Sequence, residues 1–143
     1  MARSINDLAI YRYERAEEEL SNAADLLQEG KYKLALNRSY YSIFHGMRSV
    51  NALDEFDSSK HSGVIAHFNR CHVKTGEFPK ETSRIIGSAS SLREHADYED
   101  FFIASRQEAE EQVQNAEWFL HKVRDHLTQA GIFNQTDSGP ASR

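Results

Sequence analysis

The sequence has little cysteine, proline or glycine, and no long apolar run. Its 143 residues include one cysteine, two prolines and seven glycines. A single cysteine, Cys71, excludes an internal disulfide and fits a reducing compartment, so we expect a cytoplasmic protein. No stretch reaches the roughly 20 apolar residues of a membrane-spanning helix. The N-terminal residues have no apolar run behind them. We therefore expect no signal peptide and no membrane partner.

Several motifs of enzyme chemistry are also missing. No Gly-x-Ser-x-Gly segment occurs, so the sequence carries no signature of a serine nucleophile. Gly63, Gly76 and Gly87 are isolated, and no glycine-rich phosphate loop is formed. Binding of ATP or a dinucleotide in the usual way is therefore unsupported, and we expect no cofactor.

A metal site is considered because histidine and cysteine cluster between residues 61 and 72. His67 and Cys71 are four residues apart, a spacing that can place two ligands on one helix face. No second cysteine pair and no His-Glu-x-x-His pattern accompanies them. A partly packed helix face explains the same residues, and we predict no metal.

The residues that are present favour helices. Residues 4–30 contain apolar positions spaced alternately by four and three residues, the seam of a bundle helix: Ala9, Tyr13, Ala16, Leu20, Ala23 and Leu27. Ser4 and Asp7 form a capping-box pattern at its start. Gly30 ends the helix.

The second predicted helix, from Lys31 to Ala52, is apolar around more of its circumference than the first. Such a helix is either central in its own bundle or buried in a partner. Gly46 lies inside it, where glycine costs up to about 1 kcal/mol relative to alanine. A close approach of another helix would account for this glycine, and so would simple tolerance.

The rest of the chain completes the bundle. A third helix runs to Val73, with a cap among residues 57–59. A fourth begins near Pro79 and ends near Ala96. A capping box at Ser105 and Glu108 opens a fifth, whose seam is Ala109, Val113, Ala116, Leu120, Val123 and Leu127. The prediction is an all-α antiparallel bundle of four long helices plus a short fifth over residues 1–130, with a disordered tail at 131–143.

The charge is unevenly distributed. The net charge is −5, yet residues 31–76 hold three acidic and seven basic side chains: Lys31, Lys33, Arg38, Arg48, Lys60, Arg70 and Lys74. This segment also contains four of the seven histidines. A basic, histidine-rich middle can form a local anion site in an acidic protein. The alternative is that its cations pair with acidic neighbours such as residues 17–19.

Arg38 and His45 stand out within the second helix. Seven residues make nearly two helical turns, so both side chains lie on one face, roughly 10 Å apart along the axis. A fixed guanidinium beside a residue that titrates near neutrality is suited to handling phosphate. A salt-bridged arginine and a structural histidine would give the same spacing.

The chemistry that suits this pair without a metal is RNA cleavage by the 2′-hydroxyl. Histidine can act as general acid or base, and arginine can offset charge on the phosphate. The reaction needs both an acid and a base. A two-fold dimer through the second helix would bring two copies of Arg38 and His45 into one cleft.

Asn-Arg-Ser-Tyr-Tyr-Ser-Ile-Phe-His at residues 37–45 resembles the signature helix of HEPN-domain proteins, in which an arginine is followed, after four to six residues, by a histidine. Residues 60–65, Phe68 and 73–76 resemble the next helix and loop of one prokaryotic HEPN branch. Residues 92–98 resemble its following Arg-x-x-x-Asp-Tyr segment. The resemblance spans roughly residues 5–127.

The resemblance implies a metal-independent endoribonuclease that dimerises through the motif helix, with Arg38 and His45 as the catalytic pair. It implies the toxin of a toxin–antitoxin pair, with RNA as substrate and a nucleotidyltransferase-fold antitoxin as partner. Asn37, Lys60 and His61 are expected to contact substrate.

Two features qualify these expectations. Some toxins of the family have, two residues after the histidine, a tyrosine that the antitoxin modifies with AMP, and here that position is Met47. Other HEPN domains are non-catalytic modules that bind nucleotide or substrate beside a nucleotidyltransferase, and the resemblance leaves this function open as an alternative.

Arg93 and Asp97, four residues apart, are expected to form a salt bridge that stabilises the bundle.

Overall fold

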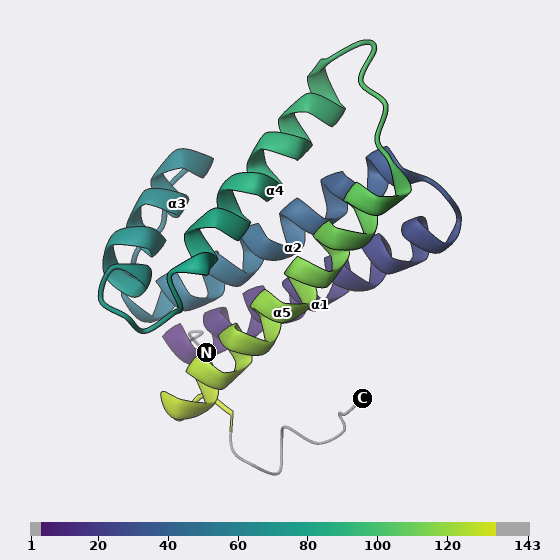
Figure 1. Cartoon of the computed structure of the whole chain (residues 1–143). Coiled ribbons are helices and arrows are strands. Elements are labelled where there is room, and N and C mark those ends of the chain that lie inside the picture. The colour runs from purple at the N-terminus through teal and green to yellow at the C-terminus, as the bar shows by residue number, and fades with distance from the viewer. Residues whose placement is uncertain (1–3, 134–143) are drawn as a thin grey trace.

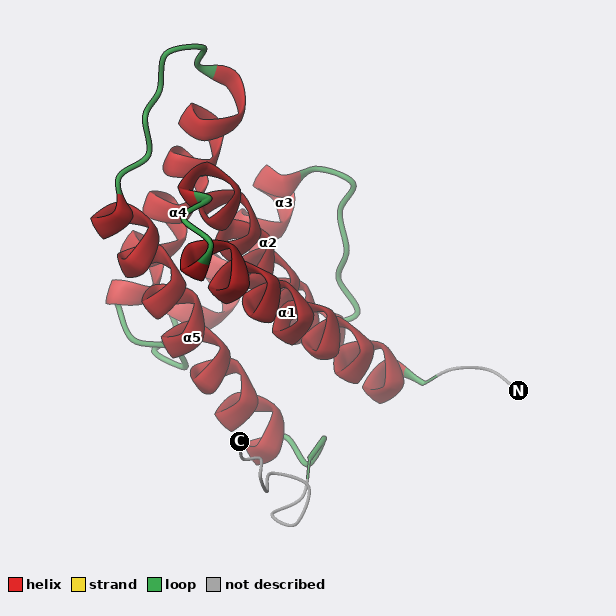
Figure 2. Ribbon diagram, turned by 90° about the vertical axis from the view of Figure 1, so that its right-hand side faces the viewer, coloured by secondary structure: helices red, strands yellow, loops and turns green. Residues whose placement is uncertain are grey.

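The computed structural model describes residues 4–133, and these residues form helices without any strand (Figure 2). Five α-helices and one π-helical segment, η1, follow one another along the chain (Figure 1). Their bounds are α1 Ile5–Gln28, α2 Tyr32–Leu53, α3 His61–Phe68, η1 Asn69–Val73, α4 Glu81–Tyr98 and α5 Arg106–Gln129. The prediction of an all-α bundle with four long helices and a short one is confirmed.

The α2 helix is the centre of the bundle, packing against α1, α3, α4 and α5 (Figure 1). Its buried positions are rich in small residues, which let neighbouring helices approach closely. The buried Ser42 hydroxyl donates to the Ala16 carbonyl of α1 at 2.9 Å. The buried Ser49 hydroxyl donates to the Ala9 carbonyl at 2.6 Å. Each bond contributes on the order of 1 kcal/mol and fixes the register of α1 against α2.

Helix ends largely follow the predicted signals. Both capping boxes are present, at Ser4 with Asp7 and at Ser105 with Glu108. Gly30, just after α1, has φ +78°, a conformation that glycine adopts without steric cost. The fourth helix differs slightly from its prediction, because α4 continues to Tyr98 and so includes the Arg93–Asp97 pair.

The predicted cap of the third helix by residues 57–59 is wrong. Lys60 occupies the N-cap position, and no side chain caps the helix. Asp57 instead accepts hydrogen bonds from Arg12 and Arg48. The expected single helix to Val73 is also divided, because the chain changes from α3 to the π-helical η1 at Asn69.

The predicted tail begins at residue 131, and its first residues are ordered. The Ile132 N–H donates to the Leu127 carbonyl, and Phe133 packs edge-on against Tyr13 with ring centroids 5.6 Å apart. Burying these apolar side chains offsets the entropic cost of ordering them. The rest of the predicted disordered segment, residues 134–143, lies outside the described residues. No helix in residues 4–133 is long and apolar enough to cross a membrane.

Gly46 sits where α5 approaches α2 closely, as the sequence suggested. A methyl group there would lie 3.0 Å from Leu120 Cδ2 and from Phe119 Cε2.

Gly87, in the exposed part of α4, offers a matched control because nothing lies within 4 Å of the equivalent position. We expect Gly87→Ala to raise the free energy of unfolding by about 0.5–1 kcal/mol. Gly46→Ala should give no such gain, and Gly46→Val should lower the free energy of unfolding by about 1–3 kcal/mol. Urea denaturation measures all three, and equal gains at both glycines would contradict the close approach.

Candidate functional site

The ring of Tyr41 lies at the centre of the side chains singled out on α2. Arg38 Cζ lies 5.1 Å from its centroid, and the His45 ring centroid lies 6.4 Å away. His61, from the start of α3, approaches the same ring edge-on at 5.7 Å. Arg93 of α4 lies 5.7 Å from it. The structure therefore brings Arg38, His45 and His61 together around one aromatic side chain.

Arg38 is held by two neighbours. Its Nη1 donates to both carboxylate oxygens of Glu19, at 3.0 and 2.9 Å. Its Nε and Nη2 donate to Asn37 Oδ1, at 2.8 and 2.5 Å. Glu19 is buried, and a charge-assisted pair of this kind is stronger than a neutral hydrogen bond. The structure thus forms the pairing with residues 17–19 that was the alternative reading of the basic segment.

Asn37 connects this arrangement to α4. Its amide nitrogen donates to both oxygens of Asp97, at 3.2 and 3.1 Å. Asp97 also accepts from Arg93 at 3.4 Å, the salt bridge predicted from their spacing. A continuous polar chain therefore runs from Glu19 on α1 through Arg38 and Asn37 to Asp97 and Arg93. Asn37 was predicted to contact substrate, and here its amide is used to orient Arg38.

His45 differs from Arg38, because its ring nitrogens make no hydrogen bond to any other residue of the range 4–133. Its ring is partly buried and lies 5.7 Å from the Phe44 ring. Burial, followed by the nearby charges of Arg15 and Arg48, lowers the pKa of His45 to about 4. The imidazole is therefore neutral at pH 7 and has a lone pair available to accept a proton.

His61 and Lys60, the two other residues predicted to contact substrate, have different surroundings in the structure. His61 packs against Phe44 with ring centroids 4.2 Å apart and planes tilted by 33°, and its Nδ1 lies 2.9 Å from the Tyr40 hydroxyl. Burial, followed by the charges of Arg93 and Arg48, lowers the pKa of His61. Lys60 is exposed at the N-cap of α3, and its backbone N–H donates to the Ser58 hydroxyl.

A surface hollow of about 520 Å³ adjoins this cluster, lined by Phe44, Arg48, Asp57, Ser58, Ser59 and His61. Arg48 was not predicted as a site residue, although it follows His45 by three residues and so lies on a neighbouring face of the same helix. Its Nη2 donates to Asp57 at 3.0 Å. The hollow offers aromatic surface, one guanidinium and hydroxyl groups beside His45.

Comparison with known proteins shows the family of the chain. The sequence model of the HEPN domain matches residues 9–126. The chain belongs to the HEPN domain family. Two Methanocaldococcus jannaschii proteins named as candidate toxins are similar to it. One is 31% identical over 119 residues, covering 83% of this chain and 81% of the relative. The other is 34% identical over 114 residues, covering 80% and 84%. A Thermotoga maritima protein named as a UPF0332 protein is 33% identical over 113 residues, covering 79% and 86%.

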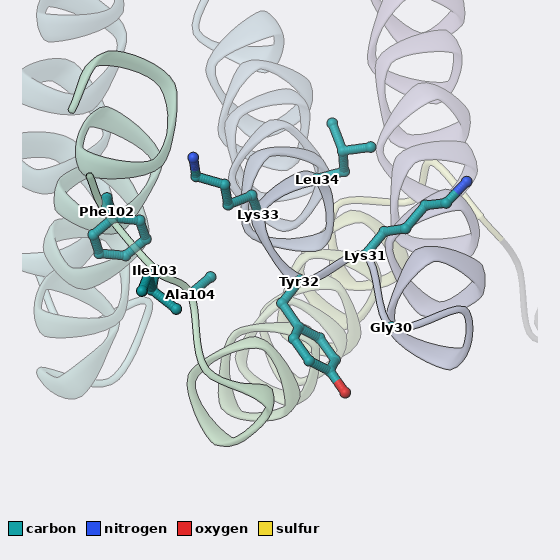
Figure 3. Close-up of a pocket in the computed structure, with 8 residues that line it drawn as sticks. All are labelled: Gly30, Lys31, Tyr32, Lys33, Leu34, Phe102, Ile103 and Ala104. Atoms are coloured by element: carbon teal, nitrogen blue, oxygen red, sulfur yellow. The ribbon is translucent and has the colours of Figure 1, made fainter. Parts of the chain in front are cut away.

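The HEPN domain also has a second surface feature, at the far end of α2. A groove of about 450 Å³ lies between the start of α2 and the connection that precedes α5 (Figure 3). Figure 3 places Phe102, Ile103 and Ala104 on one side of it and Tyr32 on the other. Ile103 is 86% exposed and the adjacent Phe101 is 95% exposed. The end of the bundle beside this groove therefore exposes large apolar side chains.

The environment of His45 predicts a pH-dependent stability for the HEPN domain. The pKa of His45 is about 4 when folded and 6.5 when unfolded, so between these values the unfolded chain binds the extra proton. Stability therefore falls as the pH decreases through 6.5, and the loss is complete below 4. We expect His45→Gln to reduce the fall in unfolding free energy between pH 7 and pH 4.5 by about 2 kcal/mol.

Urea denaturation of both proteins at the two pH values measures this difference. His61 and His126 also have lowered pKa values, so the wild type alone would not isolate His45. Equal pH dependence in the two proteins would mean that His45 is freely solvated.

Proposed function

We propose that this HEPN domain is a metal-independent endoribonuclease acting as a homodimer, and that it is the toxin of a toxin–antitoxin pair. The observation that carries the proposal is the state of His45. Its ring nitrogens have no partner among the described residues, and its imidazole is neutral at pH 7. The Tyr41 ring that it contacts also contacts the fixed guanidinium of Arg38. A histidine kept for structure would be expected to use a nitrogen in a hydrogen bond.

In the proposed reaction His45 accepts the proton of the RNA 2′-hydroxyl. The 2′-oxygen attacks the adjacent phosphorus, and the bond from phosphorus to the 5′-oxygen breaks. The partner's His45 donates a proton to that 5′-oxygen. The products are a 2′,3′-cyclic phosphate and a 5′-hydroxyl, and no metal or redox step is needed.

A phosphate group would also change the electrostatics of the site. The charges of Arg15 and Arg48 help to hold the pKa of His45 low, and a bound phosphate would offset these charges. The protonated form needed for the acid role is thereby favoured when RNA is present. The free protein keeps His45 in the base form.

Arg38 contacts the scissile phosphate in this proposal. A guanidinium has five N–H groups. Four hydrogen bonds to Glu19 and Asn37 leave one N–H of Nη2 for a phosphate oxygen. The Arg38 side chain is 35% exposed, so that N–H can be reached. Glu19 and Asn37 are then positioning residues, which hold the guanidinium beside Tyr41 before RNA binds.

The RNA strand would continue along the hollow beside His61. Phe44 and His61 provide aromatic surface on which a base can stack. The exposed Lys60, next to His61 in the chain, would supply positive charge for the backbone, and Arg48 would do so by exchanging its partner Asp57 for a phosphate. Dimerisation would place α2 of each subunit at the interface, since the reaction needs two histidines and each chain supplies one at this site.

The toxin role rests on the M. jannaschii relatives named as candidate toxins. The proposed cytoplasmic partner is a nucleotidyltransferase-fold antitoxin. The proposed second function is a non-catalytic module that binds nucleotide or substrate, in which Arg38 has only the structural role of pairing with Glu19.

RNA cleavage in EDTA tests the proposed function directly. We expect wild type to cut RNA and leave 2′,3′-cyclic phosphate ends, and His45→Ala to lower the rate by about 10²–10⁴-fold because the acid–base group is lost. His121→Ala, on the exposed side of α5, is a matched control that should retain full activity. Product ends are identified by mass spectrometry, and mass spectrometry also checks the purified protein for a bound antitoxin.

Activity that persists in His45→Ala would contradict the role of His45. Absence of cleavage by antitoxin-free wild type would favour the non-catalytic binding module. Growth of cells expressing each variant gives a parallel measurement, in which only His45→Ala should relieve toxicity.

Arg38→Lys tests whether the proposed phosphate contact needs the planar guanidinium of Arg38 or only its positive charge. Lysine keeps the positive charge but cannot bond Glu19, Asn37 and phosphate as a planar fork. We expect the cleavage rate to fall by about 10–10³-fold with a small change in RNA affinity, since the lost contact acts on developing charge. An unchanged rate would mean that Arg38 serves only as the structural partner of Glu19. Thermal melting of each variant controls for loss of folding.

A further inference from the structure

Three potential metal ligands meet at the C-terminal end of α2, away from the Arg38 cluster. Asp54 directly follows α2, His67 lies in the last turn of α3, and His72 lies in η1. Asp54 Oδ2 is 2.9 Å from His67 Nε2 and 2.6 Å from His72 Nε2. The three ligand atoms all lie within 4.8 Å of one another. Both histidines are buried, whereas the side chain of Asp54 is 33% exposed.

The π-helical turn is what brings the two histidines to one point. In an α-helix, residues five apart lie roughly 140° apart around the axis and face different directions. The η1 segment instead has a five-residue hydrogen bond, from the Lys74 N–H to the Asn69 carbonyl at 2.9 Å. This wider turn rotates His72 towards the face of His67. Single π turns within helices occur frequently at functional sites.

The two contacts of His72 match the arrangement of a metal ligand with a supporting carboxylate. Its Nδ1 lies 2.6 Å from Glu77 Oε1, while its Nε2 faces Asp54 Oδ2. A carboxylate on Nδ1 fixes the proton there and leaves the lone pair of Nε2 directed at Asp54. A lone pair facing a carboxylate oxygen is repulsive unless a proton or a cation lies between them. Ligand histidines in metal sites typically donate their other N–H to a carboxylate in this way.

His67 is oriented by different neighbours. Its ring is stacked on Phe56 with centroids 3.9 Å apart and planes 6° from parallel. Its Nδ1 lies 3.8 Å from the Cys71 sulfur and 3.5 Å from Nη2 of the exposed Arg70. A guanidinium can only donate, so Nδ1 of His67 accepts from Arg70 and the Nε2–H donates to Asp54. A metal bound at Nε2 would replace this proton.

We propose that Asp54, His67 and His72 bind a divalent first-row transition metal, with Zn²⁺ the best match, and that Glu77 supports His72 from outside the ligand set. Two imidazoles and one carboxylate with an open fourth position form a ligand set that zinc commonly occupies. Ligands about 2.0–2.1 Å from zinc stand roughly 3.3 Å apart at tetrahedral angles. Asp54 would need to withdraw by less than about 1 Å, and its exposed side chain can do so.

This inference replaces the prediction of no metal from the sequence. It also differs from the His67–Cys71 pair considered there, because Cys71 lies against Nδ1 while the ligand atoms converge at Nε2. A metal bound at this site would connect η1 and α3 to the end of α2. It is independent of the proposed ribonuclease, in which no metal takes part.

Metal binding by the full chain tests the proposal, using tag-free protein stripped with EDTA and desalted. We expect wild type to retain one zinc per chain after loading and gel filtration. We expect Co²⁺ to give the intense visible absorption of four-coordinate cobalt. Zinc at 100-fold above its dissociation constant should raise Tm by roughly 5–10 °C.

Variants identify the ligands. Asp54→Asn and His72→Gln should lose the bound zinc and the cobalt spectrum, and Glu77→Gln should weaken binding by about 10–100-fold. His121→Gln is a matched control that should bind zinc as wild type does. Circular dichroism in EDTA checks that each variant is folded, and Glu77→Gln serves as the mildest change if a ligand variant unfolds.

Two outcomes would overturn the proposal. Wild type that retains no stoichiometric zinc would show that these three side chains do not form a metal site. Zinc retained equally by His72→Gln would place the metal elsewhere. Because RNA cleavage is measured in EDTA, failure of the zinc site and failure of the proposed ribonuclease are distinguished.

Discussion

The fold depends on the burial of α2. Of its 22 residues, 13 are buried, and this is possible because small residues line the sides that face its neighbours. Serine hydroxyls bond carbonyl groups of α1, and Gly46 lets α5 approach. Apolar burial provides most of the stabilisation, at about 25 cal/mol per Å². The serine bonds add specificity, because they are satisfied in only one register of α1 against α2.

The same burial explains the chemistry of the candidate site. A polar side chain on a central helix must find partners on the helices that cover it. Arg38 finds Glu19 on α1, and Asn37 finds Asp97 on α4. These bonds fix the guanidinium and the two outer helices at once. His45 lies on the same helix without such a partner, and burial, followed by the charges of Arg15 and Arg48, keeps its imidazole neutral. A rigid cation and an unengaged base therefore share one surface, the combination from which the proposed ribonuclease is built.

The two ends of α2 have different surroundings. The end near Tyr32 adjoins the exposed groove beside Ile103 (Figure 3), which offers mainly apolar surface. The other end stops at Asp54, where Glu55 takes a left-handed conformation with φ +57° that costs roughly 1–2 kcal/mol in an ordinary residue. The chain turns there and returns through α3 and the π turn, which directs His72 at the same carboxylate as His67. Irregular backbone is thus concentrated where polar groups converge.

The sequence by itself determined the elements that depend on local information. Apolar spacing predicted the long helices, capping boxes predicted two of their starts, and residues 37–45 indicated the family. The contacts between residues that are distant in the sequence were decided only by the tertiary structure. Sequence reasoning left pairing of the basic segment with residues 17–19 as an alternative. It could not decide that Glu19 holds Arg38, because the two are 19 residues apart and meet only when α1 packs on α2. It could not place Asp54 beside His67 and His72, because helical spacing assumes 3.6 residues per turn and the π turn breaks that rule. Nor could it show that His45 is neutral, since the lowered pKa arises from burial and from charges that the tertiary structure gathers around it.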